Sequence, residues 1–250
     1  MRWAKDRCCT VRITVFRGGM KKRGVQMGVK DFFARVAALF FPNRCLGCHQ
    51  VIPPDAVFCS GCGRQYGRDK RERFFPLTVR RGEYRHFSCH TAGTYAGGLK
   101  QSMARLKFHG RTAYARPFSR LMENSGIHFA EYDVITFVPM TEEAKRKRGY
   151  NQSELLAKAL AKRVALPCEP LLKKVKSNRK QRSLTKKERM QNVRNVYEPA
   201  GTITDRRILL VDDILTTGAT LGECAVVLYR AGAKHVCGLC AVNTQELRGE

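Results

Sequence analysis

Paired acids followed by hydroxyl side chains form the clearest chemical pattern in this sequence. Four apolar residues, Ile208–Val211, precede Asp212 and Asp213, and a small polar loop follows. Backbone N–H groups and hydroxyls in a loop that opens a helix favour phosphate. Carboxylates in contact with phosphate would repel it, so these two suit sugar hydroxyls, with a divalent cation offsetting their charge. The pattern predicts a site for a phosphorylated sugar. The expected loop residues are Thr216, Thr217, Gly218, Ala219 and Thr220.

A second pattern consists of four cysteines in two Cys-x2-Cys pairs separated by ten residues: Cys45, Cys48, Cys59 and Cys62. Each pair fits a tight turn that directs two thiolates to one tetrahedral ion. Four thiolates leave no open coordination position, so we expect a structural zinc ion. Disulfides and a redox pair are the alternatives, and the two matching spacings disfavour both. Whether this knuckle also contacts nucleic acid stays open.

The charge balance favours a polyanionic partner. Lys and Arg total 47 against 21 Asp and Glu, a net charge of +26, and such a surface attracts nucleic acid or phosphorylated metabolites. A generally basic surface without such a role is the alternative. The densest basic run comprises Lys173, Lys174, Lys176, Arg179, Lys180, Arg182, Lys186, Lys187 and Arg189. It suits phosphate backbones but lacks the aromatic side chains of single-strand binders. A solvated run or a flap that closes over the ligand is equally compatible with it.

Apolar runs alternate with helical patterns in the second half of the chain. Strands are expected at 87–95, 134–138, 208–211 and 235–242, and helices at 99–108, 112–124, 151–164 and 220–230. This order predicts an α/β fold whose parallel sheet is covered by helices on both faces. Ligands of such sheets bind where strands end and helices begin, which is where the acids and the loop lie.

The expected organisation has three parts. Residues 1–27 are irregular, either disordered or a misassigned start, and 28–85 hold a helix, the zinc knuckle and a linker. The α/β domain spans 86–245, with a basic flap at about 173–195. The sequence has neither an apolar run of about 18 residues nor the apolar core of a signal peptide. Eleven cysteines, four of them in paired spacing, indicate metal binding in a reducing compartment, so we expect the cytoplasm.

The Ile208–Thr220 run resembles the phosphoribosyl pyrophosphate (PRPP) motif of class I phosphoribosyltransferases. The resemblance implies that the paired acids bind ribose hydroxyls, that the loop binds the 5-phosphate, and that Mg²⁺ accompanies PRPP. It also implies a pyrophosphate-contacting loop at Pro139 and Met140. Hypoxanthine–guanine salvage enzymes usually carry an acid where this chain has Thr216, which disfavours that substrate class.

The order of motifs along the whole chain resembles the competence protein F (ComF) family, bacterial proteins linked to DNA uptake and use. These motifs are the four cysteines, Leu106–Gly110, Arg148–Gln152, Gln181, Arg189–Asn192 and the PRPP motif. By this resemblance, which spans roughly residues 40 to 242, the site-facing candidates are Lys107, Arg148, Asn151 and Arg189.

Two departures from the family pattern stand out. Many relatives carry a second cysteine pair before the strand near Thr94, where this chain has only Cys89 and His90. Lys174 also replaces a usual arginine, which weakens the case for bidentate phosphate contact there.

Two functions are compatible with these features. An enzyme would transfer ribose-5-phosphate from Mg-PRPP to an unknown acceptor, with Lys107 and Arg148 as catalytic candidates that stabilise the departing negative charge. No clear general base emerges. A single-stranded DNA-binding module on the same fold, without turnover, is the alternative, and competence-machinery proteins are further candidate partners. Fold resemblance does not establish turnover.

Overall fold

The computed structural model describes residues 43–53, 55–66, 70–175 and 196–244. The chain divides into two compact units, Met1–Phe40 and Phe41–Glu250, and all described residues belong to the second. The helix expected before the cysteines and the interpretation of residues 1–27 lie outside the described residues. The same is true of most of the basic run, from Lys176 to Arg189.

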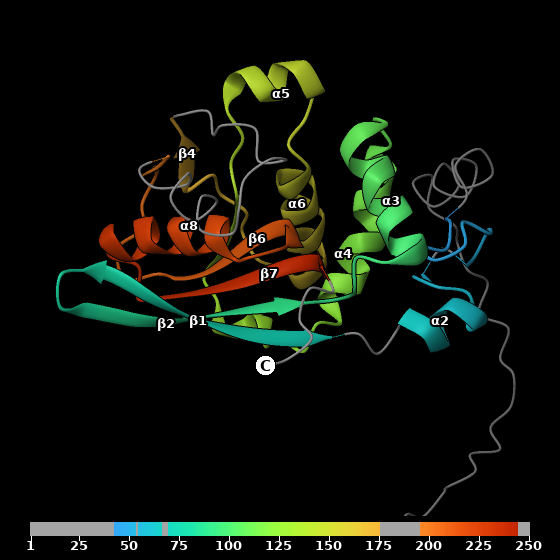
Figure 1. The fold of residues 1–250 in the computed structure, drawn as a ribbon, viewed down its shortest axis with the longest axis horizontal. Helices are drawn as coiled ribbons and strands as arrows, with labels where there is room; N and C mark the ends of the chain where they lie inside the picture. Colours follow the sequence, from blue (N-terminus) through green and yellow to red (C-terminus); the bar gives the residue numbers. More distant parts are fainter. Residues whose placement is uncertain (1–42, 54, 67–69, 176–195, 245–250) are drawn as a thin grey trace, which may run out of the picture. The chain divides into compact units, whose positions relative to one another are not determined.

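A five-stranded sheet with the order β1-β2-β7-β6-β3 forms the centre of the fold (Figure 1). Its strands are β1 (Arg71–Arg80), β2 (Glu83–Thr91), β3 (Val134–Phe137), β6 (Arg207–Leu215) and β7 (His235–Asn243). Strands β2, β7, β6 and β3 run parallel, and β1 joins β2 as an antiparallel edge strand. The expected parallel sheet is therefore confirmed, with one antiparallel addition.

Helices cover the parallel strands on both faces. One face packs against α3 (Gly97–Phe108), α4 (Ala115–Glu123) and α6 (Gln152–Val164), and the other against α8 (Ala219–Arg230). Neighbouring residues of β6 show the division, since Leu209 belongs to the first core and Leu210 to the second. Strands of this kind are apolar throughout because both faces are buried.

Smaller elements complete the described fold. They are α2 (Ser60–Tyr66), α5 (Glu142–Arg148), two 3-10 helices (Thr112–Tyr114 and Phe129–Glu131), and a two-stranded sheet of β4 (Leu172–Lys174) and β5 (Tyr197–Pro199). Helix α4 begins at Ala115, so Pro117 lies in its first turn, where a missing N–H costs little.

The charged segment after Cys62 differs from the linker that the sequence indicated. It forms α2 and then β1, whose alternate residues Leu77 and Val79 are buried in the core that contains α8. The outward residues of β1 are exposed and polar or charged for the most part. This edge strand buries one face only, so charged residues alternate with the apolar ones along it. The charged residues obscured the two-residue period of the apolar positions in the sequence.

Two boundaries near the expected site also differ. Strand β6 continues to Leu215, so both acids lie within the strand and the loop before α8 is reduced to residues 216–218. The basic segment after Met140 is a short helix, α5, that ends at Gly149 in a left-handed conformation. Helix α6 is capped by Asn151, whose side chain accepts a hydrogen bond from the Ser153 N–H.

Candidate functional site

The loop between β6 and α8 is shaped by Gly218. This residue has φ of 81°, and a Cβ added to it would lie 2.4 Å from Cε1 of Phe75. Only glycine fits both constraints. The Thr217 hydroxyl accepts a hydrogen bond of 3.3 Å from the Ala219 N–H at the start of the helix. A small pocket beside the loop is lined by Asp212, Ile214, Leu215, Thr216, Gly218, Thr220 and Leu221. The acids' strand and the helix N-terminus thus meet at one pocket, as the sequence pattern indicated.

The two acids have different partners. Asp212 Oδ1 accepts hydrogen bonds from the Ser153 hydroxyl at 2.7 Å and from the Asp213 N–H at 2.9 Å. Asp213 is buried, and its Oδ2 lies 3.0 Å from Lys107 Nζ. One acid is therefore neutralised by an ion pair, while its neighbour lines the pocket.

The surroundings of Asp212 and Lys107 shift the pKa of each side chain. Burial and then the charge of Asp213 raise the pKa of Asp212 to about 7, although Ser153 and Lys107 oppose this shift. Burial disfavours the charged form of Lys107, but Asp213, Asp212 and Tyr95 together outweigh that effect and leave the pKa of Lys107 above its usual value. Near neutral pH, Asp212 thus exchanges a proton readily while Lys107 stays charged.

Residues 150–153 tie three elements to the acids. The Tyr150 hydroxyl donates to the carbonyl of Leu106 in α3, and Asn151 Nδ2 donates to the carbonyl of Val138 at 3.0 Å. Ser153, in the first turn of α6, then reaches Asp212. Helix α3, which carries Lys107, is therefore fastened to the end of β3 and to the acids by one short segment.

The remaining residues expected to bind PRPP do not contact the two acids directly. Pro139 is buried and Met140 half-buried at the end of β3. This end lies beside the acids' strand, because the Val138 N–H donates to the Val211 carbonyl at 3.0 Å. Arg148 donates to Gln152 Oε1 at 2.6 Å, and its guanidinium lies 5.6 Å from the Phe108 ring centroid. Arg148 thus lies against α3 and α6, whereas Lys107 contacts an acid directly.

The first residues of the expected basic flap belong to β4. Lys173 pairs with Glu198 at 2.9 Å, and Lys174 Nζ lies 5.5 Å from the Tyr197 ring centroid. Burial lowers the pKa of Lys174, although Cys224 and Asp212 oppose this shift. The other flap residues, Lys176, Arg179, Lys180, Arg182 and Arg189, lie outside the described part of the chain.

The sequence analysis missed two contacts that β1 makes with the loop. Arg73 Nη1 donates to the Thr216 carbonyl at 3.2 Å, and the Arg73 guanidinium lies 5.0 Å from the Phe75 ring centroid. Phe75 in turn packs on Gly218. The alternation of apolar residues from Phe75 to Val79 was the signal that could have revealed this strand.

The four cysteines gather as their spacing predicted. Their sulfur atoms all lie within 4.8 Å of one another, and Cys48 Sγ lies 3.7 Å from Cys59 Sγ. A disulfide needs about 2.05 Å, whereas sulfurs around a tetrahedral zinc at about 2.3 Å lie roughly 3.8 Å apart. The N–H of Cys62 donates to Cys59 Sγ and lowers the pKa of Cys59 to about 7, whereas burial raises the pKa of Cys62. The donor set fits a four-thiolate metal centre.

The cysteine knuckle packs directly on α3. The Ser102 hydroxyl donates to the Leu46 carbonyl at 2.8 Å, and a Cβ on Gly98 would lie 1.6 Å from the Gly47 carbonyl oxygen. Gly98 therefore permits contact between the two backbones. Because α3 also carries Lys107, which pairs with Asp213, the knuckle and the paired acids contact the same helix.

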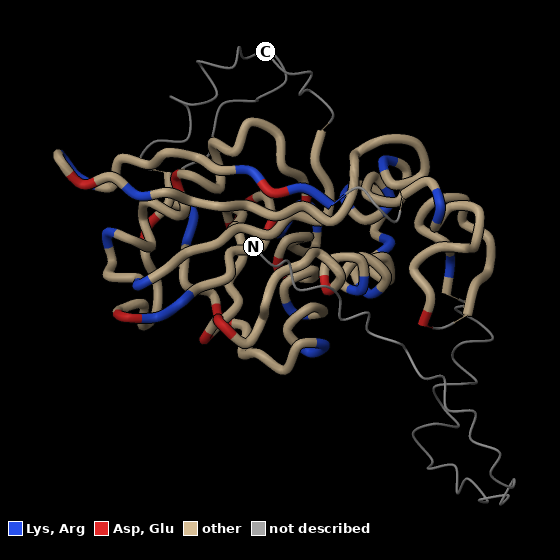
Figure 2. Tube along the Cα trace, turned by 90° about the horizontal axis from the view of Figure 1, so that it is seen from below, with Lys and Arg blue, Asp and Glu red and all other residues tan. Residues whose placement is uncertain are grey.

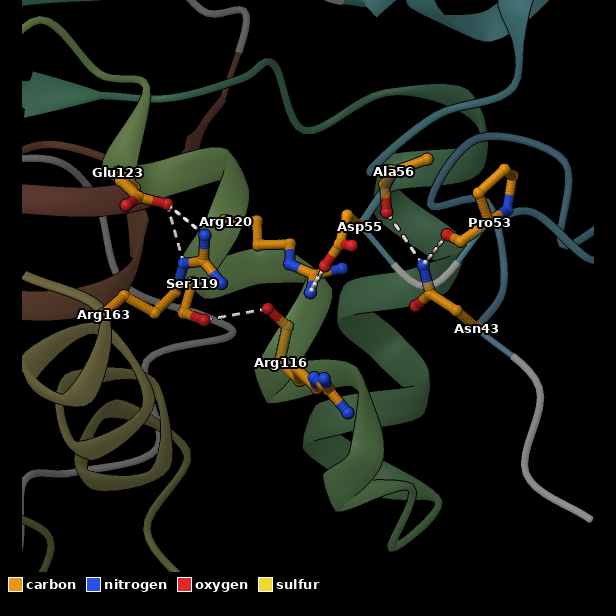
Figure 3. Close-up of polar contacts among 9 residues, drawn as sticks. All are labelled: Asn43, Pro53, Asp55, Ala56, Arg116, Ser119, Arg120, Glu123 and Arg163. Atoms are coloured by element: carbon orange, nitrogen blue, oxygen red, sulfur yellow. Dashed lines mark hydrogen bonds and ion pairs between the residues drawn. The ribbon is translucent and has the colours of Figure 1, made fainter. Parts of the chain in front are cut away.

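A second contact joins the knuckle to α4. Arg120 donates to Asp55 at 2.7 Å, and Figure 3 shows the two side chains pointing toward one another. Asn43 Nδ2 closes the knuckle loop by donating to the carbonyls of Pro53 and Ala56 (Figure 3). The knuckle is thus fixed against two helices of the first core.

Comparison with known proteins agrees with these features. Residues 151–249 match the family model described as the phosphoribosyl transferase domain. The DNA utilization protein YhgH of Escherichia coli K12 is 30% identical over 222 residues, which cover 80% of this chain and 90% of that protein. The chain belongs to the ComF family. Competence protein F of Haemophilus influenzae is 28% identical to this ComF protein over 224 residues, 79% of this chain and 95% of the relative.

Solved structures similar to the ComF chain include two longer proteins. One is a glutamine PRPP amidotransferase from B. subtilis, with a TM-score of 0.39 and 22% identity over 56% of this chain and 30% of that chain. The other is a PRPP synthetase from Mycobacterium smegmatis, with a TM-score of 0.32 and 18% identity over 50% of this chain and 33% of that chain. The ComF chain thus spans about a third of their length.

The family model and the observed sheet establish a class I phosphoribosyltransferase-type α/β domain, preceded by a four-cysteine cluster. Within the described residues, no helix has the length and apolar character that crossing a bilayer requires.

Proposed function

We propose that this ComF protein binds Mg-PRPP, or a related ribose-5-phosphate, in the pocket between β6 and α8. The observation that carries the proposal is the pairing of a pocket-lining Asp212 with a buried Asp213 that Lys107 neutralises. An anionic ligand can approach such a pair because one of the two negative charges is already compensated. Asp212 then remains to accept hydrogen bonds from ribose hydroxyls.

The proposed contacts divide the ligand among three segments. The 5-phosphate binds the N–H groups and hydroxyls of Thr217, Gly218 and Thr220 at the start of α8. The ribose hydroxyls bind Asp212. The pyrophosphate lies toward Pro139, Met140 and Lys107, with Arg148 approaching from α5. Mg²⁺ would neutralise charge on the pyrophosphate oxygens. It is a hard cation, and carboxylates and water are ligands that suit it.

The reaction that fits this site is transfer of ribose-5-phosphate to an acceptor. The bond between C1 and the pyrophosphate oxygen breaks, the acceptor bonds to C1, and pyrophosphate leaves with the electron pair. Lys107 and Arg148 stabilise the leaving negative charge. A site that binds PRPP without turnover, within a single-stranded DNA-binding protein, is the second candidate, and the net charge of +26 favours it.

The cellular setting follows from the relatives and the composition. Relatives of this chain are named for competence and DNA utilization, so we place its action in DNA uptake or use, with single-stranded DNA and competence-machinery proteins as partners. Eleven cysteines with a zinc-type cluster favour the reducing cytoplasm. We assign zinc to the cysteine cluster as a structural ion.

Calorimetric titration with Mg-PRPP tests the ligand. Wild type should bind saturably, and Asp212→Asn/Asp213→Asn should abolish binding. Asp205→Asn is the matched control, since Asp205 is an exposed acid whose φ of 59° asparagine tolerates. Ribose-5-phosphate and pyrophosphate, titrated separately, report the two halves of the site. If folded, metal-loaded wild type binds none of the three, the PRPP site is excluded and the DNA function stands alone.

A further inference from the structure

The hairpin formed by β1 and β2 exposes most of one face. The register places Phe74 opposite Ser88, Pro76 opposite His86 and Thr78 opposite Tyr84, so these six side chains share a face. The opposite face is buried in the core that contains α8. Phe74 is 67% and Tyr84 73% exposed, and His86 is also exposed. Three aromatic rings thus face outward in a domain that buries most of its large apolar side chains.

The spacing of these rings matches an extended strand of nucleic acid. Phe74, His86 and Tyr84 follow one another at two-residue intervals along the ribbon, which corresponds to about 6.8 Å per step. Bases in a duplex stack about 3.4 Å apart and leave no room for a ring between them. At twice that spacing, each ring can stack on one unpaired base, so the ladder favours a single strand over a duplex.

Positive charge lies at both ends of this ladder. Lys70 and Arg71 begin the hairpin, and Arg80 and Arg81 lie at its turn, all of them exposed. Arg80 Nη2 donates to the Arg230 carbonyl of α8 at 3.2 Å, so its side chain is directed toward the opposite face. Figure 2 shows Lys and Arg at both ends of the hairpin. Of the two acids, Glu72 lies 3.2 Å from His90 and Glu83 lies 3.2 Å from Arg85. The side chains available to a phosphate backbone are therefore mainly basic.

The composition of the face disfavours a protein partner. Polar side chains, Thr78 and Ser88, interrupt the rings, so the face offers no continuous apolar patch of the kind that protein interfaces bury at their centre. Separated rings flanked by cations are typical of single-strand binding surfaces. The basic run from Lys173 to Arg189 lacks such rings, so the hairpin provides the component that run does not contain.

We infer that the aromatic ladder of Phe74, His86 and Tyr84 is a binding surface for single-stranded DNA, with bases stacked on the rings and phosphates held by Lys70 and Arg81. The inference rests on the DNA-handling part of the proposed function. It is independent of the PRPP pocket, because none of these side chains lines that pocket.

Two oligomers of equal charge separate stacking from electrostatics. Fluorescence anisotropy compares an oligothymidylate of about 12 nucleotides with an abasic deoxyribose-phosphate chain of the same length. Phe74→Leu/Tyr84→Leu should weaken oligothymidylate binding roughly 10- to 100-fold, because stacking is lost while the apolar character is kept. The same variant should bind the abasic chain as wild type does.

A charge variant and a control complete the design. Lys70→Gln/Arg81→Gln should weaken both oligomers and reduce the slope of log affinity against log salt by about 1.4, the value for two single-strand phosphate contacts. Val51→Ser, which removes an exposed apolar side chain outside the hairpin, should change neither affinity. Circular dichroism melting confirms that each variant is folded.

The outcomes distinguish binding at the aromatic ladder from DNA binding by the chain as a whole. Wild-type binding that Phe74→Leu/Tyr84→Leu leaves intact would exclude the ladder but keep DNA binding elsewhere on the chain. Equal wild-type affinity for the two oligomers, or preference for duplex DNA, would also overturn the ladder. Failure of wild type to bind oligothymidylate at low salt would exclude the DNA-handling function itself.

Discussion

The ring of Phe75 occupies the space that a side chain at Gly218 would need. A Cβ on Gly218 would lie 2.4 Å from Phe75 Cε1 and 2.6 Å from its Cζ. An edge strand far away in the sequence thus supports the loop between β6 and α8, and this loop lines the same pocket as Asp212. Loop shape and strand packing are therefore coupled.

Gly218→Ala should distort the loop through both the clash and the backbone conformation. We expect a loss of stability of about 1–3 kcal/mol and a weaker affinity for Mg-PRPP, measured by urea unfolding and calorimetry. Gly82→Ala is the matched control, because Gly82 has the same φ of 81° but no atom within 4 Å of its added Cβ. Equal stability losses in the two variants would show that the Phe75 contact contributes nothing.

Arg73→Ala should weaken PRPP binding by removing the hydrogen bond to the Thr216 carbonyl. A partly exposed bond of this kind corresponds to about 1 kcal/mol, or roughly a fivefold change in Kd. Arg230→Ala removes a similar bond, from Arg230 to the Val79 carbonyl at the other end of α8, and should leave Kd unchanged. Calorimetry with Mg-PRPP measures both, and the same Kd for the two variants would argue against a positioning role for Arg73.

Substitution by asparagine should change Tm in opposite directions at the two neighbouring acids. Because the folded pKa of Asp212 is about 7, above its ordinary 3.8, the folded protein holds a proton that the unfolded chain has lost between these values. Stability attributable to Asp212 therefore falls as pH rises from about 4 to about 7. Asp212→Asn should raise Tm at pH 8 and change it little at pH 4.

Asp213→Asn should lower Tm instead, because it leaves Lys107 buried without its partner. Breaking a buried ion pair costs about 3–5 kcal/mol. Lys107→Met should have a comparable effect, and Lys107→Arg should restore part of the lost stability. Differential scanning calorimetry at both pH values measures all variants. A rise in Tm at pH 8 for Asp213→Asn would contradict the assignment of the ion pair.

Removal of the metal should affect both the knuckle and the distant pocket. The knuckle packs on α3 through Leu46 and Ser102, and the same helix carries Lys107. Cys59→Ser should lose bound zinc, lower Tm and weaken Mg-PRPP affinity, as measured by elemental analysis, thermal unfolding and calorimetry. Cys168→Ser, a half-buried cysteine outside the cluster, should retain one zinc ion per chain. Unchanged PRPP affinity after zinc loss would exclude coupling through α3.

The ligands themselves remain predictions, but much of the scaffold was accessible from local patterns. The apolar run before Asp212, the stripe of α6 and the cap at Asn151 depend on residues close together in the chain. The cysteine spacing likewise predicted a cluster that the structure contains. Periodicity, caps and short turns act over a few residues, so a single sequence carries their signal.

The sequence by itself thus determined the strand–loop–helix order around Asp212, the cysteine cluster and most strands and helices of the parallel domain. Only the tertiary structure decided that Lys107 pairs with Asp213, that Ser153 holds Asp212 and that β1 supports Gly218. These partners come from separate helices and strands, so no local period records them. They meet because parallel strands end at one edge of the sheet and because an amphipathic edge strand gains stability by packing on α8.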